Sequence, residues 1–288
     1  MAPAQQPSAA TPSAARPPQV PEDARVLLDV PYVENGHPRQ KLDLYVPAHP
    51  KGPVLVWIHG GGWRAGTKDH PPGLSVIKNG VTVVSLEYRF SQDAIFPAQI
   101  EDCKAALRWL RAHAKEYGYR DDLFAAWGAS AGGHLVALLA TTGKTKDFDV
   151  GENLDQSSAI QCGVDMFGPS DLPAYDPNLP EAMVQRENPN SVLAQLLGGL
   201  VSQKLDLAKR ASPVTWVTKD AAPLLIMQGT KDPLVPVDQS QRLYDKLKAA
   251  GADVTLDIIE GAGHSGPEFS TPEKLKMIFT FLTKHWAG

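Results

Sequence analysis

A serine between small residues is the first candidate for chemistry in this chain of 288 residues. Gly128-Ala-Ser130-Ala-Gly132 fits the pattern G-x-S-x-G, follows the apolar run 123–127 and precedes the apolar segment 133–142. A serine on a sharp strand-to-helix turn needs neighbours without bulky side chains, and the helix N-terminus there favours negative charge. Ser130 is therefore the expected nucleophile, and an ordinary glycine-flanked turn is the alternative.

A serine hydroxyl is a weak nucleophile and needs a base. His264 is the best candidate because it stands in Gly261-Ala-Gly-His264, a glycine-rich loop after the apolar run 254–259. His134 lies one helical turn beyond Ser130 and is expected to be a packed helix residue. The other histidines lie in early loops, on a helix or near the C-terminus: His37, His49, His59, His70, His113 and His285.

A carboxylate must fix the tautomer of such a base. Asp232 stands in Gln228-Gly-Thr-Lys-Asp232, just after the apolar run 224–227. The chain order is then Ser130, Asp232, His264, which is the order of the α/β-hydrolase layout. Asp238 and Glu260 are the competitors, but Asp238 is expected to cap a helix and Glu260 to end a strand.

A glycine triplet supplies candidate donors for a developing oxyanion. His59-Gly-Gly-Gly-Trp63 follows the apolar run 54–58, and glycines leave their backbone N–H groups open. Gly61, Gly62 and Ala131 are the expected donors, with His59 holding the loop through a hydrogen bond. Trp63 and Phe167 are candidates for the wall of a substrate pocket, and a packing role for either is the alternative.

Alternating apolar runs and helical patterns must position these residues. Segments 25–32 and 41–46 read as two strands around Asn35-Gly36, a hairpin signal. Runs 54–58, 81–86, 123–127, 160–167, 224–227 and 254–259 read as buried strands, and 97–116, 133–142, 240–250 and 272–286 as helices. The pattern predicts an α/β fold with a mostly parallel sheet of about eight strands covered by helices on both faces.

Two segments fall outside this alternation. Residues 1–24 form an Ala/Pro-rich leader, expected to be disordered, ahead of a domain spanning 25–288. The leader lacks a secretion signal, and we hypothesise a secreted or periplasmic protein whose signal peptide has been removed. Residues 168–222 separate two strands by a long connection and are interpreted as a lid containing helical pieces near 192–197 and 203–211.

Composition and charge limit the kinds of binding partner and cofactor that we expect. The 28 basic residues against 32 acidic ones give a net charge of −4, which argues against nucleic acid as the main partner. No apolar run approaches the roughly 20 residues that span a bilayer, so no membrane span is expected. Cys103 and Cys162 form no metal spacing, and either two buried thiols or one disulfide is open. No metal or organic cofactor is expected.

Taken together, the motifs resemble those of an α/β-hydrolase carboxylesterase, more narrowly of the bifunctional feruloyl and acetyl-xylan esterase-like group. The shared pieces are His59-Gly-Gly-Gly-Trp63, Glu87-Tyr-Arg89, Gly128-Ala-Ser-Ala-Gly-Gly-His134, Phe167-Gly-Pro-Ser-Asp171, Gly229-Thr-Lys-Asp232 and Gly261-Ala-Gly-His264. The resemblance implies hydrolysis of short-chain acyl esters, either small molecules or acetyl and feruloyl esters linked to plant polysaccharide. An amide hydrolase of the kynurenine formamidase type and a non-catalytic ligand receptor on the same fold are the alternatives.

Overall fold

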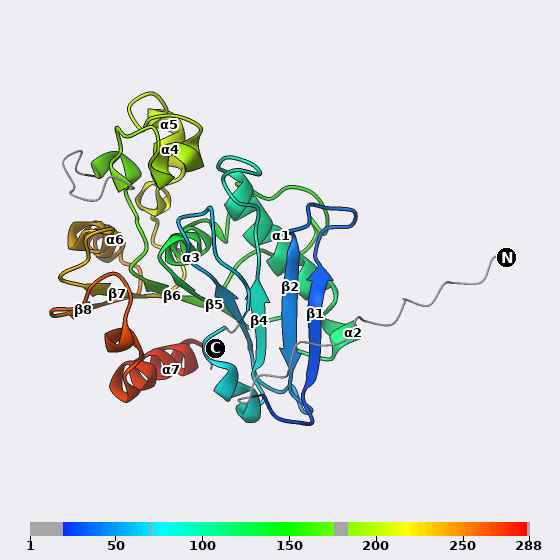
Figure 1. Ribbon diagram of the computed structural model, residues 1–288. Helices are drawn as coiled ribbons and strands as arrows, with labels where there is room; N and C mark the ends of the chain where they lie inside the picture. Colours follow the sequence, from blue (N-terminus) through cyan, green and yellow to red (C-terminus); the bar gives the residue numbers. More distant parts are fainter. Residues whose placement is uncertain (1–19, 70, 176–183, 287–288) are drawn as a thin grey trace.

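The computed structural model describes residues 20–69, 71–175 and 184–286. An eight-stranded sheet forms its centre, in the order β1-β2-β4-β3-β5-β6-β7-β8 (Figure 1). The strands are β1 Arg25–Pro31, β2 Lys41–Val46, β3 Val54–Ile58, β4 Thr82–Leu86, β5 Phe124–Ala129, β6 Cys162–Met166, β7 Leu224–Gly229 and β8 Val254–Ile259. β2 pairs antiparallel with β1 and β4, and the remaining neighbours are parallel. The predicted mostly parallel α/β sheet is confirmed.

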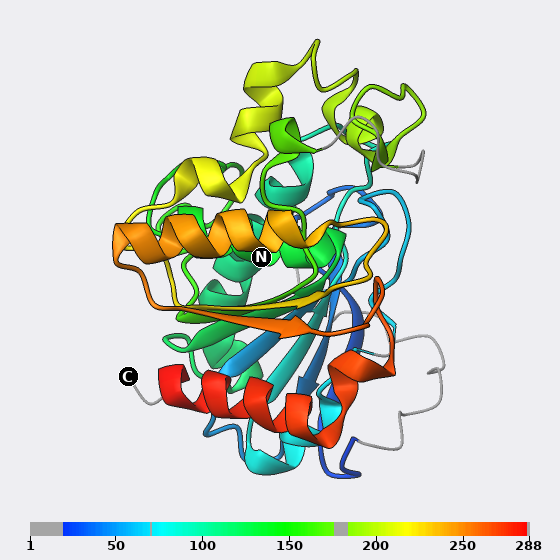
Figure 2. The same cartoon turned by 90° about the vertical axis from the view of Figure 1, so that its left-hand side faces the viewer.

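The parallel strands are mostly apolar because helices cover both faces of the sheet. One face carries α1 Ala98–Ala112, α3 Ala131–Thr142 and α6 Val237–Ala250, whose apolar residues share one core. The other face carries α7 Pro272–Trp286 and the 3₁₀ helix η1 Leu74–Asn79 over a second core. Figure 2 shows α6 and α7 on opposite sides of the sheet.

Helix boundaries differ from the sequence expectation at three places. The predicted helix 97–116 divides into α1 and α2 Ala114–Tyr117, because His113 leaves the helical conformation between them. The helix after Ser130 begins at Ala131 rather than at residue 133. The helix predicted from residue 240 already begins at Val237, after Pro236.

The connection from β6 to β7 contains the segment interpreted as a lid. It carries the short helices α4 Val192–Leu197 and α5 Leu205–Arg210, which lie beyond the carboxyl ends of the strands (Figure 1). Ser191 caps the N-terminus of α4, and its Oγ accepts the Ala194 N–H at 3.1 Å. The 3₁₀ helices η2 Leu172–Ala174 and η4 Pro213–Trp216 flank these helices, and η5 Pro267–Ser270 precedes α7. Residues 176–183 lie outside the described part of the chain.

Buried cations hold the long connection from α3 to β6. Lys104 and Arg108 of α1 are fully buried and reach Asp149 at 3.4 Å and 3.1 Å. The Lys104 ammonium also donates to the carbonyls of Thr142, Thr145 and Asp147. These charges are compensated inside the protein, as buried ions must be.

The disulfide alternative for the two cysteines is wrong, because both are buried free thiols. Cys103 of α1 packs in the core on one face of the sheet, and Cys162 of β6 packs in the core on the other face. Burial raises the pKa of the Cys162 thiol to about 12. Both residues therefore behave as small apolar side chains.

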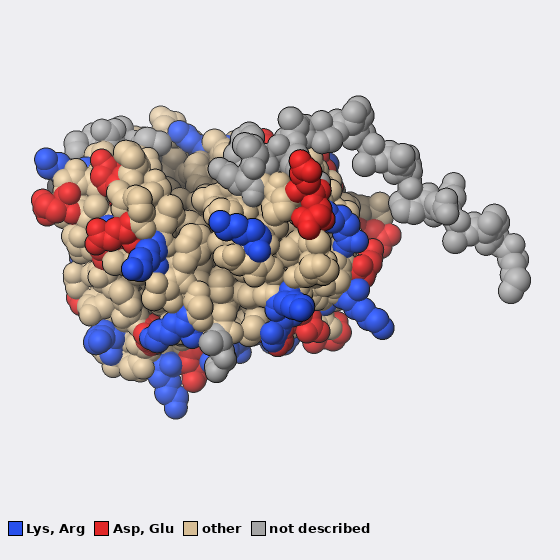
Figure 3. Space-filling model, turned by 90° about the horizontal axis from the view of Figure 1, so that it is seen from below, with Lys and Arg blue, Asp and Glu red and all other residues tan. Residues whose placement is uncertain are grey.

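The surface carries charges of both signs. Acidic and basic side chains alternate on the face shown in Figure 3, without a large area of one sign. Across the described segments, no helix combines the length and the apolar character needed to cross a membrane. Most of the predicted leader, residues 1–19, lies outside the described residues, whereas Val20 and Ala24 are buried against the core next to η1.

Candidate active site

Ser130 occupies a sharp turn between β5 and α3. Its backbone adopts φ 55° and ψ −119°, an unusual conformation for a residue with a side chain. Its N–H donates to the Met166 carbonyl at 2.8 Å, which fixes the turn to the neighbouring strand. A Cβ on Gly128 would lie 2.4 Å from the Gly132 carbonyl oxygen, and one on Gly132 would lie 2.0 Å from that of Ile58. Only glycine fits at both positions.

The structure brings Ser130, His264 and Asp232 together in one hydrogen-bonded chain. His264 Nε2 lies 2.9 Å from Ser130 Oγ, and His264 Nδ1 lies 2.7 Å from Asp232 Oδ2. The Asp232 side chain is fully buried, whereas that of His264 is 15% exposed. Since a carboxylate only accepts, Nδ1 carries the proton and Nε2 is free to accept the serine hydroxyl proton.

Four hydrogen bonds hold the Asp232 carboxylate in place, counting that from His264. The N–H groups of Leu234 and Val235 donate to Oδ1 at 2.8 Å and 2.9 Å. The side-chain amide of buried Gln228 donates to Oδ2 at 2.9 Å. The sequence assigned no role to Gln228, although a polar residue at the end of an otherwise apolar strand was a signal that it has one.

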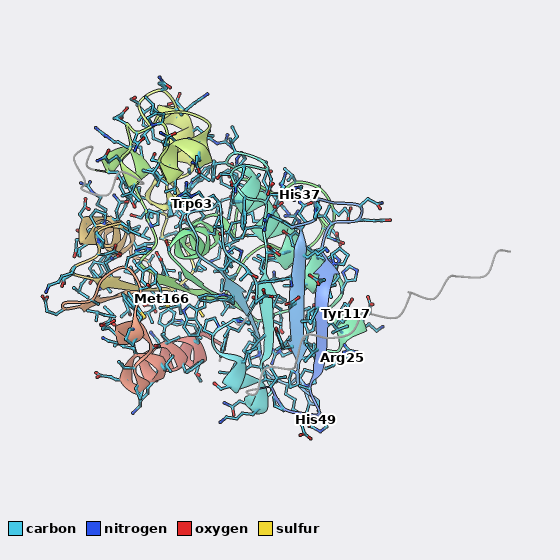
Figure 4. All side chains as sticks on the ribbon, viewed as in Figure 1. Arg25, His37, His49, Trp63, Tyr117 and Met166 are labelled. Carbon is cyan, nitrogen blue, oxygen red and sulfur yellow. The ribbon has the colours of Figure 1, made fainter. Side chains whose placement is uncertain are left out.

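The competing residues lie elsewhere or have other partners. The expectation that Asp238 caps the helix is wrong, because Pro236 occupies the N-cap position and Asp238 lies within the first turn of α6. Asp238 accepts from Arg242 at 3.0 Å, four residues further along α6, and Glu260 is exposed after β8. Figure 4 shows His37 and His49 at the side of the molecule formed by the first two strands. His70 lies outside the described residues.

The segment 59–66, called the glycine loop below, approaches Ser130 from β3. Gly61, Gly62 and Trp63 have φ values of 112°, 59° and 55°, so three successive residues leave the conformations that side chains prefer. In the part of the chain that the structure describes, the N–H groups of Gly61, Gly62 and Ala131 donate to no protein acceptor. All three residues line the same pocket as Ser130.

His59 anchors the start of the glycine loop. Its Nδ1 lies 2.7 Å from the Gly60 carbonyl oxygen, and its ring stacks on Tyr88 with centroids 4.6 Å apart. Tyr88 in turn donates its hydroxyl to the His59 carbonyl at 3.0 Å. Burial lowers the pKa of His59 to about 4, so the ring is neutral and structural.

A pocket of about 490 Å³ opens beside Ser130. Its walls come from the glycine loop, the turn around Ser130, the lid and the loops that carry Asp232 and His264. Phe167 contributes its ring, which meets the His264 ring edge-on with centroids 4.8 Å apart. The lining residues are mostly apolar or small: Gly60, Gly61, Gly62, Trp63, Arg64, Ala65, Ala129, Ser130, Ala131, Phe167, Pro169, Tyr175, Val184, Val192, Leu193, Leu234, Val235, His264 and Ser265.

The lid reaches the glycine loop directly. A Cβ on Gly62 would lie 2.9 Å from a methyl group of Val192, the first residue of α4. Trp63 lines the pocket and is 2% exposed, so its side chain packs in the core and also borders the cavity. The residues Tyr175, Val192 and Leu193 were not predicted, because their place on the pocket wall depends on how the lid folds back.

A second buried carboxyl lies under the turn that holds Ser130. Asp165 of β6 accepts the Gly168 N–H through Oδ1 at 2.9 Å, and its Oδ2 has no partner among the described residues. Burial raises the pKa of Asp165 to about 7. No group of three or more His, Cys, Asp or Glu residues in the described segments could hold a metal ion.

Comparison with known proteins adds a family and several relatives. The family description BD-FAE matches residues 42–247. The probable carboxylic ester hydrolase LipM of Mycobacterium tuberculosis is 34% identical over 235 residues, covering 76% of this chain and 51% of that protein. Esterase LipQ of the same organism is 31% identical over 238 residues, covering 78% of this chain and 53% of that protein. The chain thus spans about half the length of the curated relatives it matches.

Solved structures show the same likeness. A truncated carbohydrate esterase from gut microbiota matches with a TM-score of 0.84 and 30% identity, covering 93% of this chain and 99% of that one. A bifunctional GH43-CE protein of Bacteroides eggerthii matches with a TM-score of 0.79 and 32% identity, covering 90% of this chain and 38% of that one.

Proposed function

Because this chain belongs to the BD-FAE family and has the α/β-hydrolase fold, we propose that it is a serine carboxylesterase. The observation that carries the proposal is the hydrogen-bonded chain from Asp232 through His264 to Ser130, which ends in an apolar pocket. Relatives named as ester hydrolases support it.

In the first half of the proposed reaction, Ser130 Oγ attacks the ester carbonyl carbon while His264 Nε2 takes the hydroxyl proton. Asp232 keeps the imidazole oriented and stabilises the imidazolium that forms. The carbonyl oxygen becomes an oxyanion, which the open N–H groups of Gly61, Gly62 and Ala131 bind. The carbon–oxygen bond to the alcohol then breaks, and the imidazolium gives the alcohol its proton.

In the second half, water replaces the alcohol. His264 takes a proton from the water as its oxygen attacks the acyl carbon on Ser130. A second oxyanion forms and collapses, the bond to Ser130 breaks, and the proton returns to the serine. The products are one carboxylic acid and one alcohol, and the residues return to their starting state.

The substrates that we propose are esters of short acyl groups, including acetyl or feruloyl groups on plant polysaccharide. The apolar lining suits an acyl chain or an aromatic acid, and polar groups lie near the reacting atoms. Similarity to a carbohydrate esterase and to a bifunctional GH43-CE protein supports a carbohydrate-linked ester.

The test is a set of initial rates on p-nitrophenyl acetate, butyrate and octanoate and on methyl ferulate. Ser130→Ala should lower the rates by roughly 10³-fold or more, since the nucleophile is removed. Ser75→Ala, a serine exposed in η1, is the matched control and should keep the wild-type rates.

Two outcomes would contradict the proposal. Equal rates for the wild type and Ser130→Ala would remove the serine mechanism and favour a ligand receptor on this fold. Turnover of N-formylkynurenine without turnover of any ester would favour the amide hydrolase instead.

A further inference from the structure

The glycine loop has an unusual backbone that its own hydrogen bonds hold only in part. Within the loop, the N–H groups of Arg64 and Ala65 donate to the Gly61 carbonyl at 3.2 Å and 3.0 Å. Trp63, a bulky residue, stands at φ 55°. Such a conformation persists only where the surroundings enforce it. The contacts of Trp63 outside the loop therefore decide where the adjacent Gly61 and Gly62 N–H groups lie.

One of these contacts is to buried His134 on α3. The indole Nε1 of Trp63 lies 3.1 Å from His134 Nδ1, and the two rings meet edge-on with centroids 5.1 Å apart. An indole nitrogen only donates, so His134 Nδ1 must accept and the proton of the neutral ring sits on Nε2. Burial lowers the pKa of His134 to about 4, so the imidazole stays neutral around pH 7.

The other nitrogen of the same imidazole reaches the lid. His134 Nε2 lies 2.6 Å from the carbonyl oxygen of Ala211, the C-cap residue that follows α5. Carbonyls at a helix end have no partner within their helix, so this bond satisfies one of them. His134 thus bridges three parts of the site: the helix after Ser130, the glycine loop and the lid.

His134 has no other chemical role open to it. It is fully buried, and both ring nitrogens are already bonded, so it neither contacts substrate nor exchanges a proton with it. A purely structural role in packing α3 is the alternative that an experiment must separate from a role in the reaction.

We propose that His134 is a positioning residue, which holds the Gly61 and Gly62 N–H groups toward the oxyanion by bonding Trp63 and the lid carbonyl of Ala211 at once. This inference rests on the proposed esterase function. It assigns the imidazole an effect on the transition state rather than on substrate binding, because the oxyanion exists only after Ser130 attacks.

The experiment compares three variants on p-nitrophenyl butyrate. His134→Leu removes both hydrogen bonds and should lower kcat roughly 10- to 100-fold, a part of the 10²–10³-fold cost of losing an oxyanion donor outright, with little change in KM. His134→Gln offers an amide oxygen and an amide N–H in its place and should recover most of the loss. Trp63→Phe deletes the indole donor while keeping an aromatic ring, although a smaller one, and should resemble His134→Leu in its loss of kcat.

Three further measurements separate positioning from packing. The matched control is Leu138→Ala, a fully buried residue one turn further along the same face of α3, which should lower Tm and leave kcat unchanged. A trifluoromethyl ketone, whose adduct with Ser130 carries an oxyanion, should bind His134→Leu more weakly by the factor that kcat/KM loses. Trp63→Phe combined with His134→Leu should cost no more than the larger single effect.

Other outcomes overturn the inference. If His134→Leu lowers Tm but keeps kcat within about threefold, as a packing residue would, the positioning role is wrong. If His134→Leu does not fold, unchanged kcat in Trp63→Phe refutes the positioning role instead. A wild-type chain that hydrolyses no ester overturns the proposed function first and this inference with it.

Discussion

The buried carboxyl of Asp165 makes the stability of the fold depend on pH in a defined direction. Its pKa in the folded chain is about 7 because burial disfavours the charged form, whereas an exposed aspartate titrates near 3.8. Between these values the folded chain binds a proton that the unfolded chain has released. The stabilisation is therefore complete below the unfolded pKa and is lost as pH rises through about 7.

Replacing Asp165 by Asn removes this titration and keeps an oxygen for the Gly168 N–H. With pKa values of about 7 and 3.8, linkage gives a loss of about 3 kcal/mol of wild-type stability between pH 5 and pH 8 from this group alone. The free energy of unfolding of Asp165→Asn should fall by about 3 kcal/mol less than that of the wild type over that pH range. The free energy of unfolding of Asp165→Asn minus that of the wild type should therefore be larger at pH 8 than at pH 5.

Urea unfolding followed by tryptophan fluorescence at pH 5 and pH 8 measures the difference. Asp220→Asn, an exposed carboxyl in the loop before β7, is the control and should keep the wild-type pH dependence. The same pH dependence in Asp165→Asn and wild type would refute the reasoning, because it would mean that the buried carboxyl does not titrate in this range.

Three further changes have defined outcomes. Gly132→Ala should abolish ester turnover per folded molecule, checked by kcat/KM with circular dichroism, because its Cβ would lie 2.0 Å from the Ile58 carbonyl oxygen. Val192→Ala should enlarge the pocket and raise the octanoate-to-butyrate ratio of kcat/KM by roughly 10-fold. An unchanged ratio would mean that α4 does not contact the acyl chain of the substrate. Lys104→Met should lower the free energy of unfolding in urea by about 3 kcal/mol, since it leaves the buried Asp149 carboxylate with fewer cations, and a loss below about 1 kcal/mol would contradict that account.

The sheet could be predicted because each parallel strand is a mostly apolar run, and several of them end at a glycine-rich or polar motif. Since parallel strands present their carboxyl ends at one edge, the segments after β3, β5, β7 and β8 had to meet there. That rule brings Ser130, Asp232 and His264 near one another from residues far apart in the chain. Gly128 and Gly132 could be predicted on steric grounds alone, because a sharp turn around Ser130 requires neighbours without bulky side chains.

The partners of polar side chains could not be predicted in the same way. Glu87 pairs with Arg39 and Arg89 with Asp102, and the sequence alone identified neither partner. Which cation meets which carboxylate depends on strand register and helix rotation, and these are set by packing of the whole core. The hydrogen bond from Gln228 to Asp232 could not be predicted for the same reason.

The lid helices α4 and α5 have six residues each, too short to persist as helices unless they pack on the rest of the domain. The two helices therefore stay folded only while they are docked on the domain, and the pocket keeps its shape only in that docked state. A molecule that fills the pocket touches Val192 and Leu193 of the lid together with the loops of the sheet, so its binding energy adds to the folding energy. At a concentration 100 times its Kd such a ligand adds about 2.7 kcal/mol, enough to raise Tm by several degrees. Thermal shifts of the inactive Ser130→Ala chain can therefore rank intact esters by affinity before any turnover is measured.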